Sequence, residues 1–295
     1  MAATPTRALE LALLGLLALL WGSSYLFIRV AVATIPPLTL IAVRVSVAAL
    51  ALLALLAALG MRLPRGRIAR RALLVQAMLN SVLPWTLLAW GQQFVPSGLA
   101  GVLNSTSPVF VFLAARFTTR GEQAGAAQLA GALLGIAGVM LIVGRGALEG
   151  LGHAVAAQLA ILAAALLYAL AAIYGRRHAD TPPLATAAGT LAWASLWLVP
   201  ASLVVDRPWT LSPTTASVAA ALALAILGTA LALLVYFRLV RTLGAMGVAS
   251  QSYLRAGVSV LLGAGILGER VDAATTAGLA AVLAGVALIN RRKPA

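Results

Sequence analysis

The chain has 295 residues, of which 62% are hydrophobic and only 9% are charged, and its mean hydropathy is +1.01. This number of polar residues is too small to cover the surface of a soluble globule of this length. The composition therefore excludes a soluble protein and indicates an integral membrane protein. The net charge of +14 does not indicate a nucleic-acid partner, because the arginines are spread through short loops between apolar runs. The sequence contains no cysteine, which excludes disulfides and thiolate metal sites.

The predicted elements are apolar helices, because hydrocarbon offers the backbone no other hydrogen-bond partners and a helix needs about twenty residues to cross it. The first apolar run begins at Leu9 and continues through Trp21 to Val32 without a small-residue cleavage site, so we interpret it as an uncleaved span and not as a signal peptide. Nine further spans are predicted at residues 36–59, 68–91, 97–117, 125–143, 153–175, 183–205, 214–238, 244–267 and 272–290. The expected fold is an all-α polytopic membrane protein with ten transmembrane helices.

The basic residues predict the orientation of these spans. If the N-terminus is cytoplasmic, fifteen arginines and lysines fall at cytoplasmic span ends and four at outer ends. Cytoplasmic loops carry an excess of positive charge, so we expect both termini in the cytoplasm.

The two halves of the chain repeat each other. Five spans per repeat is an odd number, so the second copy must be inverted in the membrane, which is an architecture of secondary transporters with a substrate site near the midplane. We expect a first repeat at residues 1–147, with helices 1–5, and a second at 148–295, with helices 6–10. A shift of 147 residues superposes Gly121-Glu122 on Gly268-Glu269, Gly131 on Gly278, Gly138 on Gly285 and Trp21 on Tyr168.

A single arginine stands out in the ninth predicted span. Arg255 lies eleven residues from Gly244, roughly 16 Å at about 1.5 Å per residue, which is near the midplane of a bilayer core about 30 Å thick. An arginine there costs about 2.5–3.5 kcal/mol on insertion scales, so it should face a cavity or the protein interior. Gln251 and Ser259 precede and follow it by four residues and therefore share its helix face.

Other polar and aromatic residues of the spans extend this site. Asn104 and Pro108 are the repeat equivalents of Gln251 and Arg255, and a twofold relation between the repeats would bring the two faces together. Hydrogen bonding between helices is the alternative role for these amides and hydroxyls. The candidate substrate-binding residues are Arg255, Gln251, Asn104, Ser259, Asn80, Trp85, Trp21, Ser24 and Tyr168.

Four further residues are expected to be structural. Arg44 lies about 12 Å from the outer end of its span, where its side chain can reach the interface. Pro108 frees a backbone carbonyl within its helix. Glu122 and Glu269 open the fifth and tenth spans, where a carboxylate suits the positive end of a helix. Those two spans carry small residues in place of polar ones, which favours close helix packing.

The two five-helix halves each have an early aromatic residue in the first helix, a proline-containing first turn and an Arg/Leu-Gly-Glu sequence between helices four and five. In these features, and over nearly its whole length, the chain resembles the EamA family of the drug/metabolite transporter superfamily, and within it the YddG-type bacterial amino-acid exporters. The resemblance implies a basket of ten helices in the inner membrane. It also implies a central cavity built mainly by helices 1, 3, 4, 6, 8 and 9, with helices 5 and 10 at the back. The second repeat departs from the family in having Arg255 at the position of Pro108.

The predicted function is export of small metabolites by alternating access, with neutral or aromatic amino acids as the expected substrates. A multidrug exporter of cationic or amphipathic compounds is one alternative, and a channel is another. An enzyme is not expected, because the predicted spans contain no constellation of His, Cys, Asp or Glu. We expect no cofactor and no metal, only the solute and the lipid bilayer as partners, and a functional monomer, with a homodimer as the alternative.

Overall fold

The computed structural model describes residues 7–118, 126–148, 152–178, 180–249, 251–270 and 272–289, and Glu122 lies outside them. These residues form helices and no strand, which confirms the all-helical membrane class. Six helices are long and apolar enough to cross a membrane: Ala8–Ala31, Pro37–Ala58, Arg67–Gly91, Ala154–Gly175, Pro183–Val205 and Thr215–Leu239. Four shorter apolar helices lie at Ser97–Leu113, Leu129–Leu141, Leu254–Leu267 and Ala273–Gly285, within the other four predicted spans. Ten complete crossings remain a prediction.

The first two helices of each repeat follow the expected boundaries. Pro37 and Pro183 start the second helix of each repeat, because proline fits the first helical turn and needs no backbone donor there. The four helices are α1 (Arg7–Ala31), α2 (Pro37–Ala58), α8 (Gly152–Gly175) and α9 (Pro183–Val205).

The third helix of each repeat contains a π-helical turn. The two π turns lie at nearly equivalent positions, because the shift of 147 residues superposes the first π turn on the start of the second. Pro84 explains the first turn because it lacks the N–H that a regular helix requires. In the second, the Thr229 hydroxyl donates to the carbonyl of Leu224 at 3.0 Å. The segments are α3 (Arg67–Ala77), η1 (Met78–Val82) and α4 (Leu83–Gly91), and α10 (Thr215–Ala225), η4 (Ile226–Leu231) and α11 (Ala232–Ala249).

The fourth helix of each repeat differs from the prediction. In the first repeat it is interrupted at Ser105 and Thr106, between α5 (Ser97–Asn104) and α6 (Ser107–Thr118). In the second, residues 244–249 belong to α11, and α12 runs from Gln251 to Leu267. The predicted start at Gly244 is therefore wrong, because isolated glycines do not end a helix and no proline follows α11. Arg255 lies in the second turn of α12 and not eleven residues into the helix.

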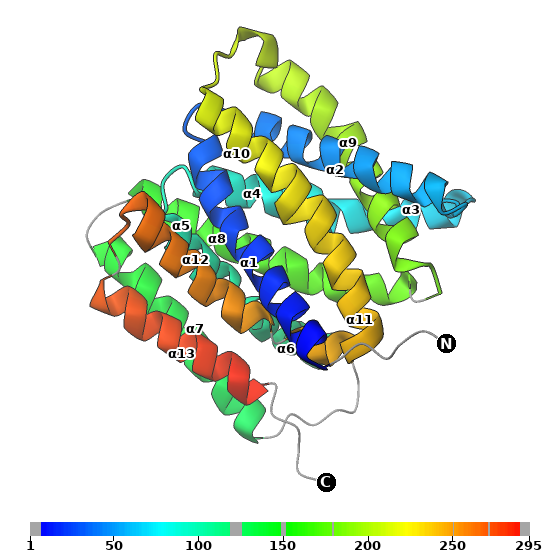
Figure 1. Cartoon of the computed structure of the whole chain (residues 1–295). Helices are drawn as coiled ribbons and strands as arrows, with labels where there is room; N and C mark the ends of the chain where they lie inside the picture. The colour runs from blue at the N-terminus through cyan, green and yellow to red at the C-terminus, as the bar shows by residue number, and fades with distance from the viewer. Residues whose placement is uncertain are drawn as a thin grey trace.

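The small-residue helices α7 (Ala126–Leu148) and α13 (Ala273–Ile289) lie side by side at one edge of the molecule (Figure 1). A Cβ atom at Gly138 would lie 2.8 Å from the carbonyl oxygen of Gly278, and one at Gly285 would lie 2.5 Å from that of Gly131. Gly138 corresponds to Gly285 in the repeat, and Gly278 corresponds to Gly131, so the two contacts are equivalent by the symmetry of the repeats. Two antiparallel helices with reciprocal contacts are related by a local twofold axis.

The two repeats are interleaved around the centre of the molecule. Helix α2 packs along α9, α1 packs along α12, and α4 packs along α8. Each of these pairs joins one helix of the first half of the chain to one of the second half. Figure 1 shows α1 crossing the middle of the bundle, with α10 and α11 on one side and α12 on the other. This arrangement leaves the space between the repeats as the place for a site.

Candidate functional site

A cavity of about 860 Å³ lies between the two repeats. Its volume falls within the range of about 300–1,000 Å³ that is usual for small-molecule sites. Among the described residues, α7 and α13 contribute nothing to its lining, so these two helices lie behind the cavity. The lining comes from α1, α2, α3, η1, α4, α5, α6, α8, η2 (Arg176–His178), α9, η4, α11 and α12, together with the turn before α9.

Eight of the nine candidate substrate-binding residues line this cavity. The exception is Ser259, which is 1% exposed and whose hydroxyl donates to the carbonyl of Ala256 at 2.8 Å. Ser259 packs against Gly101 of α5, where any side chain would collide with it. The eight are Arg255, Gln251, Asn104, Asn80, Trp85, Trp21, Ser24 and Tyr168.

Arg44 does not reach toward the interface as the sequence predicted. It is 6% exposed and lines the cavity, with its guanidinium carbon 3.7 Å from the ring centroid of Trp85. Its Nε donates to the hydroxyl of Thr229 at 2.9 Å. An aromatic face and a hydroxyl attract a guanidinium without neutralising its charge. These two neutral partners hold Arg44 inside the protein, so it lines the cavity and does not lie at the bilayer boundary.

Arg255 is the second cation of the cavity. Its side chain is partly buried, and its Nε is buried without a hydrogen-bond partner among the described residues. The hydroxyl of Tyr168 lies within electrostatic range of both Arg44 and Arg255. The described lining residues include no aspartate or glutamate. Within this part of the chain, the cavity therefore holds two guanidinium groups and no acid.

Two amides of the cavity lining each have a buried oxygen atom without a hydrogen-bond partner in the described structure. Asn104 is 2% exposed and donates from Nδ2 to the hydroxyl of Tyr25 at 2.7 Å, while its Oδ1 has no partner in the described structure. Gln76 donates from Nε2 to the carbonyl of Ala171 at 3.4 Å, and its Oε1 is likewise buried and unpaired there. Buried acceptors are costly to leave unsatisfied, so each is suited to a donor on a ligand.

Aromatic side chains form much of the remaining wall. Trp21 packs against Tyr236 of α11 with ring centroids 5.4 Å apart and an angle of 42° between the planes. Tyr168, the repeat equivalent of Trp21, lines the cavity from α8, and Pro108 lines it from α6. Trp85 has one face covered by Arg44. The cavity thus combines apolar walls with a few convergent polar groups, as small-molecule sites do.

The end of the molecule that contains Arg270 is closed by hydrogen bonds. Arg29 donates to the carbonyls of Gln92 and Gln93, which ties α1 to the turn after α4. Asp206 accepts from the backbone N–H of Thr39 at 2.7 Å and so ties α9 to α2. None of the residues in these ties lines the cavity.

Glu269 takes part in the same closure, although the sequence predicted it as a cap for the tenth span. Its carboxylate accepts from the backbone N–H of Ser97 at 2.6 Å and of Gly98 at 3.0 Å, at the first turn of α5. Asp272 holds the predicted place at α13, where Oδ1 accepts from the N–H of Thr275 at 2.7 Å. Gly268 adopts a positive φ of 65° just before Glu269. That turn directs the carboxylate across the repeats to α5.

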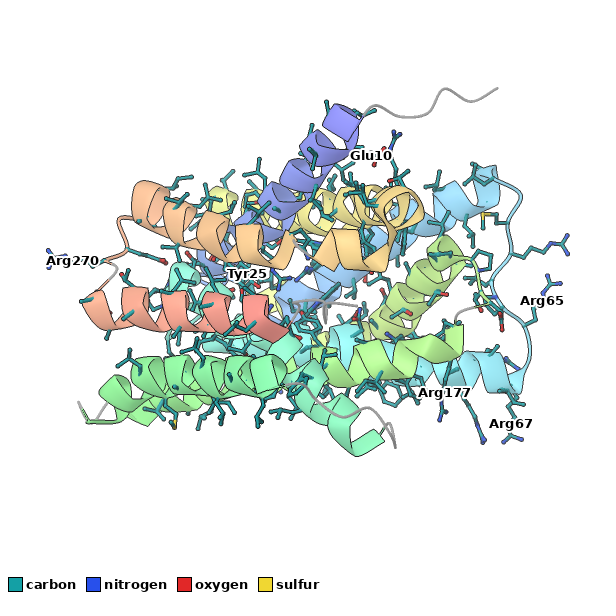
Figure 2. All side chains as sticks on the ribbon, turned by 90° about the horizontal axis from the view of Figure 1, so that it is seen from below. Glu10, Tyr25, Arg65, Arg67, Arg177 and Arg270 are labelled. Carbon is teal, nitrogen blue, oxygen red and sulfur yellow. The ribbon has the colours of Figure 1, made fainter. Side chains whose placement is uncertain are left out.

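The cavity extends toward the opposite end. His178, Thr181 and Pro183 line it at the end of α8 and the start of α9, and Pro183 is exposed. Arg177 lies beside this region, and Figure 2 shows Arg65, Arg67 and Arg177 at one end of the molecule and Arg270 at the other. The cavity therefore approaches the arginine-rich end.

Sequence reasoning missed the cavity-facing position of Arg44 and its contact with Thr229. The only available signal was that Arg44 and Arg255 are the two arginines that lie away from the ends of the predicted spans. The π turns were also missed. They place Asn80 and Ser81 in one repeat, and Gly228 and Thr229 in the other, at the cavity wall.

A family model for EamA-like transporters matches the chain twice, at residues 9–144 and 155–291. The chain belongs to the EamA-like transporter family. It is also 30% identical over 275 residues to the uncharacterized inner membrane transporter YedA of Escherichia coli strain K12, covering 93% of this chain and 88% of YedA. This EamA protein is therefore a multi-pass membrane transporter.

Two further similarities are narrower. A probable terminal-alkyne amino-acid exporter of Streptantibioticus cattleyicolor is 37% identical over 123 residues, covering 41% of this EamA protein and 40% of the exporter. A solved crystal structure superposes with a TM-score of 0.65 over 96% of this chain and 98% of that one, at 21% identity. The second similarity supports the fold alone.

Proposed function

We propose that this transporter exports small carboxylate-bearing metabolites, and amino acids in particular, by alternating access across the inner membrane with both termini in the cytoplasm. The observation that carries the proposal is the cavity between the repeats, which contains Arg255 with an unpaired buried Nε. The sequence predicted neutral or aromatic amino acids. The planar guanidinium fork binds a carboxylate through two parallel hydrogen bonds.

The remaining polar groups suit the ammonium end of an amino acid. The unpaired oxygens of Asn104 and Gln76 are hydrogen-bond acceptors, and the aromatic rings of Trp21 and Tyr168, which line the cavity, can attract a cation. The relative that is named as a probable amino-acid exporter supports the same class. Cationic drugs are the alternative substrates, and two arginines without a described acidic partner repel them.

The arrangement of the repeats supports alternating access. The reciprocal contacts of Gly138 and Gly285 and the equivalent π turns are what two inverted copies of one unit would show. The closed end carries Arg270, and the cavity approaches the end that carries Arg65, Arg67 and Arg177. With the orientation that the positive charges predict, this conformation faces the cytoplasm, as an exporter must to load its substrate.

The test is counterflow in liposomes that contain the purified full chain. Vesicles loaded with unlabelled phenylalanine, glutamine or glutamate are diluted into the same labelled amino acid, and uptake is followed over time. We expect saturable counterflow of at least one amino acid, which a channel would not show. We expect Arg255→Ala to lower the ratio of maximal rate to half-saturating concentration by roughly ten- to a hundredfold, since it removes a charge-assisted contact.

Arg67→Gln is the matched control, because it removes the same charge from an exposed position. Wild-type rates in Arg255→Ala would contradict the role of Arg255. Counterflow of a lipophilic cation such as tetraphenylphosphonium, with none of any amino acid, would support the drug exporter instead.

A further inference from the structure

If the one carboxylate of a neutral amino acid binds Arg255, the buried charge of Arg44 has no anionic partner. Arg44 comes from α2 in the first repeat and Arg255 from α12 in the second, and both line the same cavity. The two arginines therefore approach one space from opposite repeats. A residue that only braced α2 would not need a charge, since Thr229 and the ring of Trp85 are both neutral.

The contacts of Arg44 use only part of its binding capacity. Nε is bonded to Thr229 and one face of the guanidinium lies on Trp85. The two terminal nitrogens have no hydrogen bond to any described residue, and they are not among the fully buried unpaired atoms. They therefore have contact with the cavity. The ring of Trp85 and the hydroxyl of Thr229 hold the fork in a fixed orientation, which favours the binding of a planar anion.

The charge balance of the cavity points in the same direction. Two guanidinium groups are present, and no described lining residue is an acid. A neutral amino acid brings one carboxylate, so it would pair one arginine and leave the other without an anionic partner. Buried charges are tolerated when they are paired. A solute with a second carboxylate would pair both arginines.

We propose that Arg44 is a second carboxylate-binding residue of the transport site, and that the preferred substrate is an acidic amino acid whose two carboxylates are bound by Arg44 and Arg255. This rests on the proposed amino-acid transport and narrows it to acidic amino acids, whereas the sequence predicted neutral or aromatic ones. Arg44 acts as a specificity residue, because it recognises the group that distinguishes glutamate from its neutral isostere glutamine.

The first experiment measures glutamate and glutamine counterflow with the same wild-type proteoliposomes. We expect glutamate to be preferred in the ratio of maximal rate to half-saturating concentration. Counterflow of glutamine or phenylalanine with little or none of glutamate would overturn the inference while leaving amino-acid transport intact. Absence of counterflow for all three would overturn both.

The second experiment compares Arg44→Gln and Arg44→Lys with the exposed control Arg67→Gln. In Arg44→Gln, which keeps a donor but loses the charge, we expect the glutamate-to-glutamine preference to fall by roughly ten- to a hundredfold, as for the loss of one charge-assisted hydrogen bond. Arg44→Lys should retain part of the preference and Arg67→Gln all of it. An unchanged preference in Arg44→Gln would overturn the role of Arg44.

A third measurement does not depend on the folding of any variant. If glutamate moves as an anion and glutamine as a zwitterion, net uptake of glutamate by wild-type vesicles carries negative charge. An inside-positive potential set with potassium and valinomycin should therefore increase glutamate uptake but not glutamine uptake. In vesicles that contain no internal amino acid, so that exchange is impossible, net glutamate uptake that ignores the potential would argue against an anionic substrate.

Discussion

Glu269 shows what a hydrogen-bonded side chain contributes at the closed end of the molecule. Its carboxylate accepts three hydrogen bonds at the start of α5, from the N–H and hydroxyl of Ser97 and the N–H of Gly98. The first N–H groups of a helix have no hydrogen-bond partner within that helix, so a carboxylate can accept from them. Its negative charge is also stabilised by the positive end of the helix dipole. Because Glu269 and α5 belong to different repeats, this cap also joins the repeats.

The first prediction concerns this cap. Glu269→Gln removes the negative charge and turns one acceptor into a donor that faces the N–H groups of α5. We expect it to lower the free energy of unfolding by about 1 kcal/mol, the typical value for loss of a cap. Thermal unfolding in a mild detergent, followed by tryptophan fluorescence, measures the change. Arg270→Gln is the control, because it alters the charge of the neighbouring exposed residue, and an equal loss in both variants would contradict the capping role.

At the residue scale, the sequence predicted which polar residues line the site better than it predicted which residues they contact. The arginine at Arg255 and the amide at Asn104 were predicted as site residues because polar groups in apolar spans are costly and therefore stand out. The sequence could not assign Arg44, because its choice between the interface and the cavity depends on Trp85 and Thr229. Those contacts join residues 41 and 185 positions away, and no local pattern encodes them.

Helices α7 and α13 show how glycine determines packing at the scale of elements. Gly131 and Gly138 face Gly278 and Gly285 so closely that backbone meets backbone. Transmembrane helices gain no hydrophobic energy from burying apolar side chains against each other, so small residues that permit close approach are a main source of their association. This pair lies behind the cavity and connects the ends of the two repeats.

The second prediction follows from that approach. A Cβ at Gly285 would lie 2.5 Å from the carbonyl oxygen of Gly131 and 2.7 Å from the nitrogen of Gly135, and backbone atoms cannot give way as a flexible side chain can. We expect Gly285→Ala to destabilise the protein by about 1–3 kcal/mol, the usual cost of overpacking. Thermal unfolding in detergent measures it, and Gly265→Ala is the control, because a Cβ there meets nothing within 4 Å.

The same variants report on oligomeric state. We propose that the protein functions as a monomer, because the small-residue faces are already occupied within one chain. The destabilisation by Gly285→Ala should therefore not depend on protein concentration. Native mass spectrometry that shows only a lipid-stable dimer, lost in Gly285→Ala, would contradict this.

The boundaries of the elements were predictable where proline marks them. Pro37 and Pro183 start α2 and α9 within one residue of the predicted positions. No proline marks the extension of α11 to Ala249 or the π turn at η4, so the local sequence contains no signal for either feature. In both places the helix follows from tertiary packing, and at η4 from the hydroxyl of Thr229, which replaces a backbone donor.

At the scale of the whole molecule, a cavity closed at one end agrees with a carrier better than with a channel. A channel needs a continuous path, whereas a carrier alternates between two closures around one site. The ties of Arg29 and Glu269 would have to break for the cavity to reach the Arg270 end. The repeats and the class of protein were predictable from the sequence, because the 147-residue shift and the composition are global properties. The conformation was not predictable, because one sequence encodes every conformation that a carrier would adopt.

The last prediction concerns the energy source. A proton-driven carrier needs a group that binds and releases a proton where access alternates, yet the described lining residues include no carboxylate, and arginine stays protonated at physiological pH. The buried acid Glu10 lies away from this lining and is bonded to Thr242 at 2.6 Å.

We therefore expect exchange or facilitated transport down the solute gradient, which in a cell that accumulates amino acids means export. Proteoliposomes clamped at zero membrane potential with valinomycin and equal potassium should show no accumulation above equilibrium when only a pH gradient is imposed. The same vesicles preloaded with substrate provide the control, because counterflow must still occur in them. Accumulation driven by the pH gradient alone would contradict the prediction. It would direct attention to Glu10 and to His178, the one described histidine of the cavity lining.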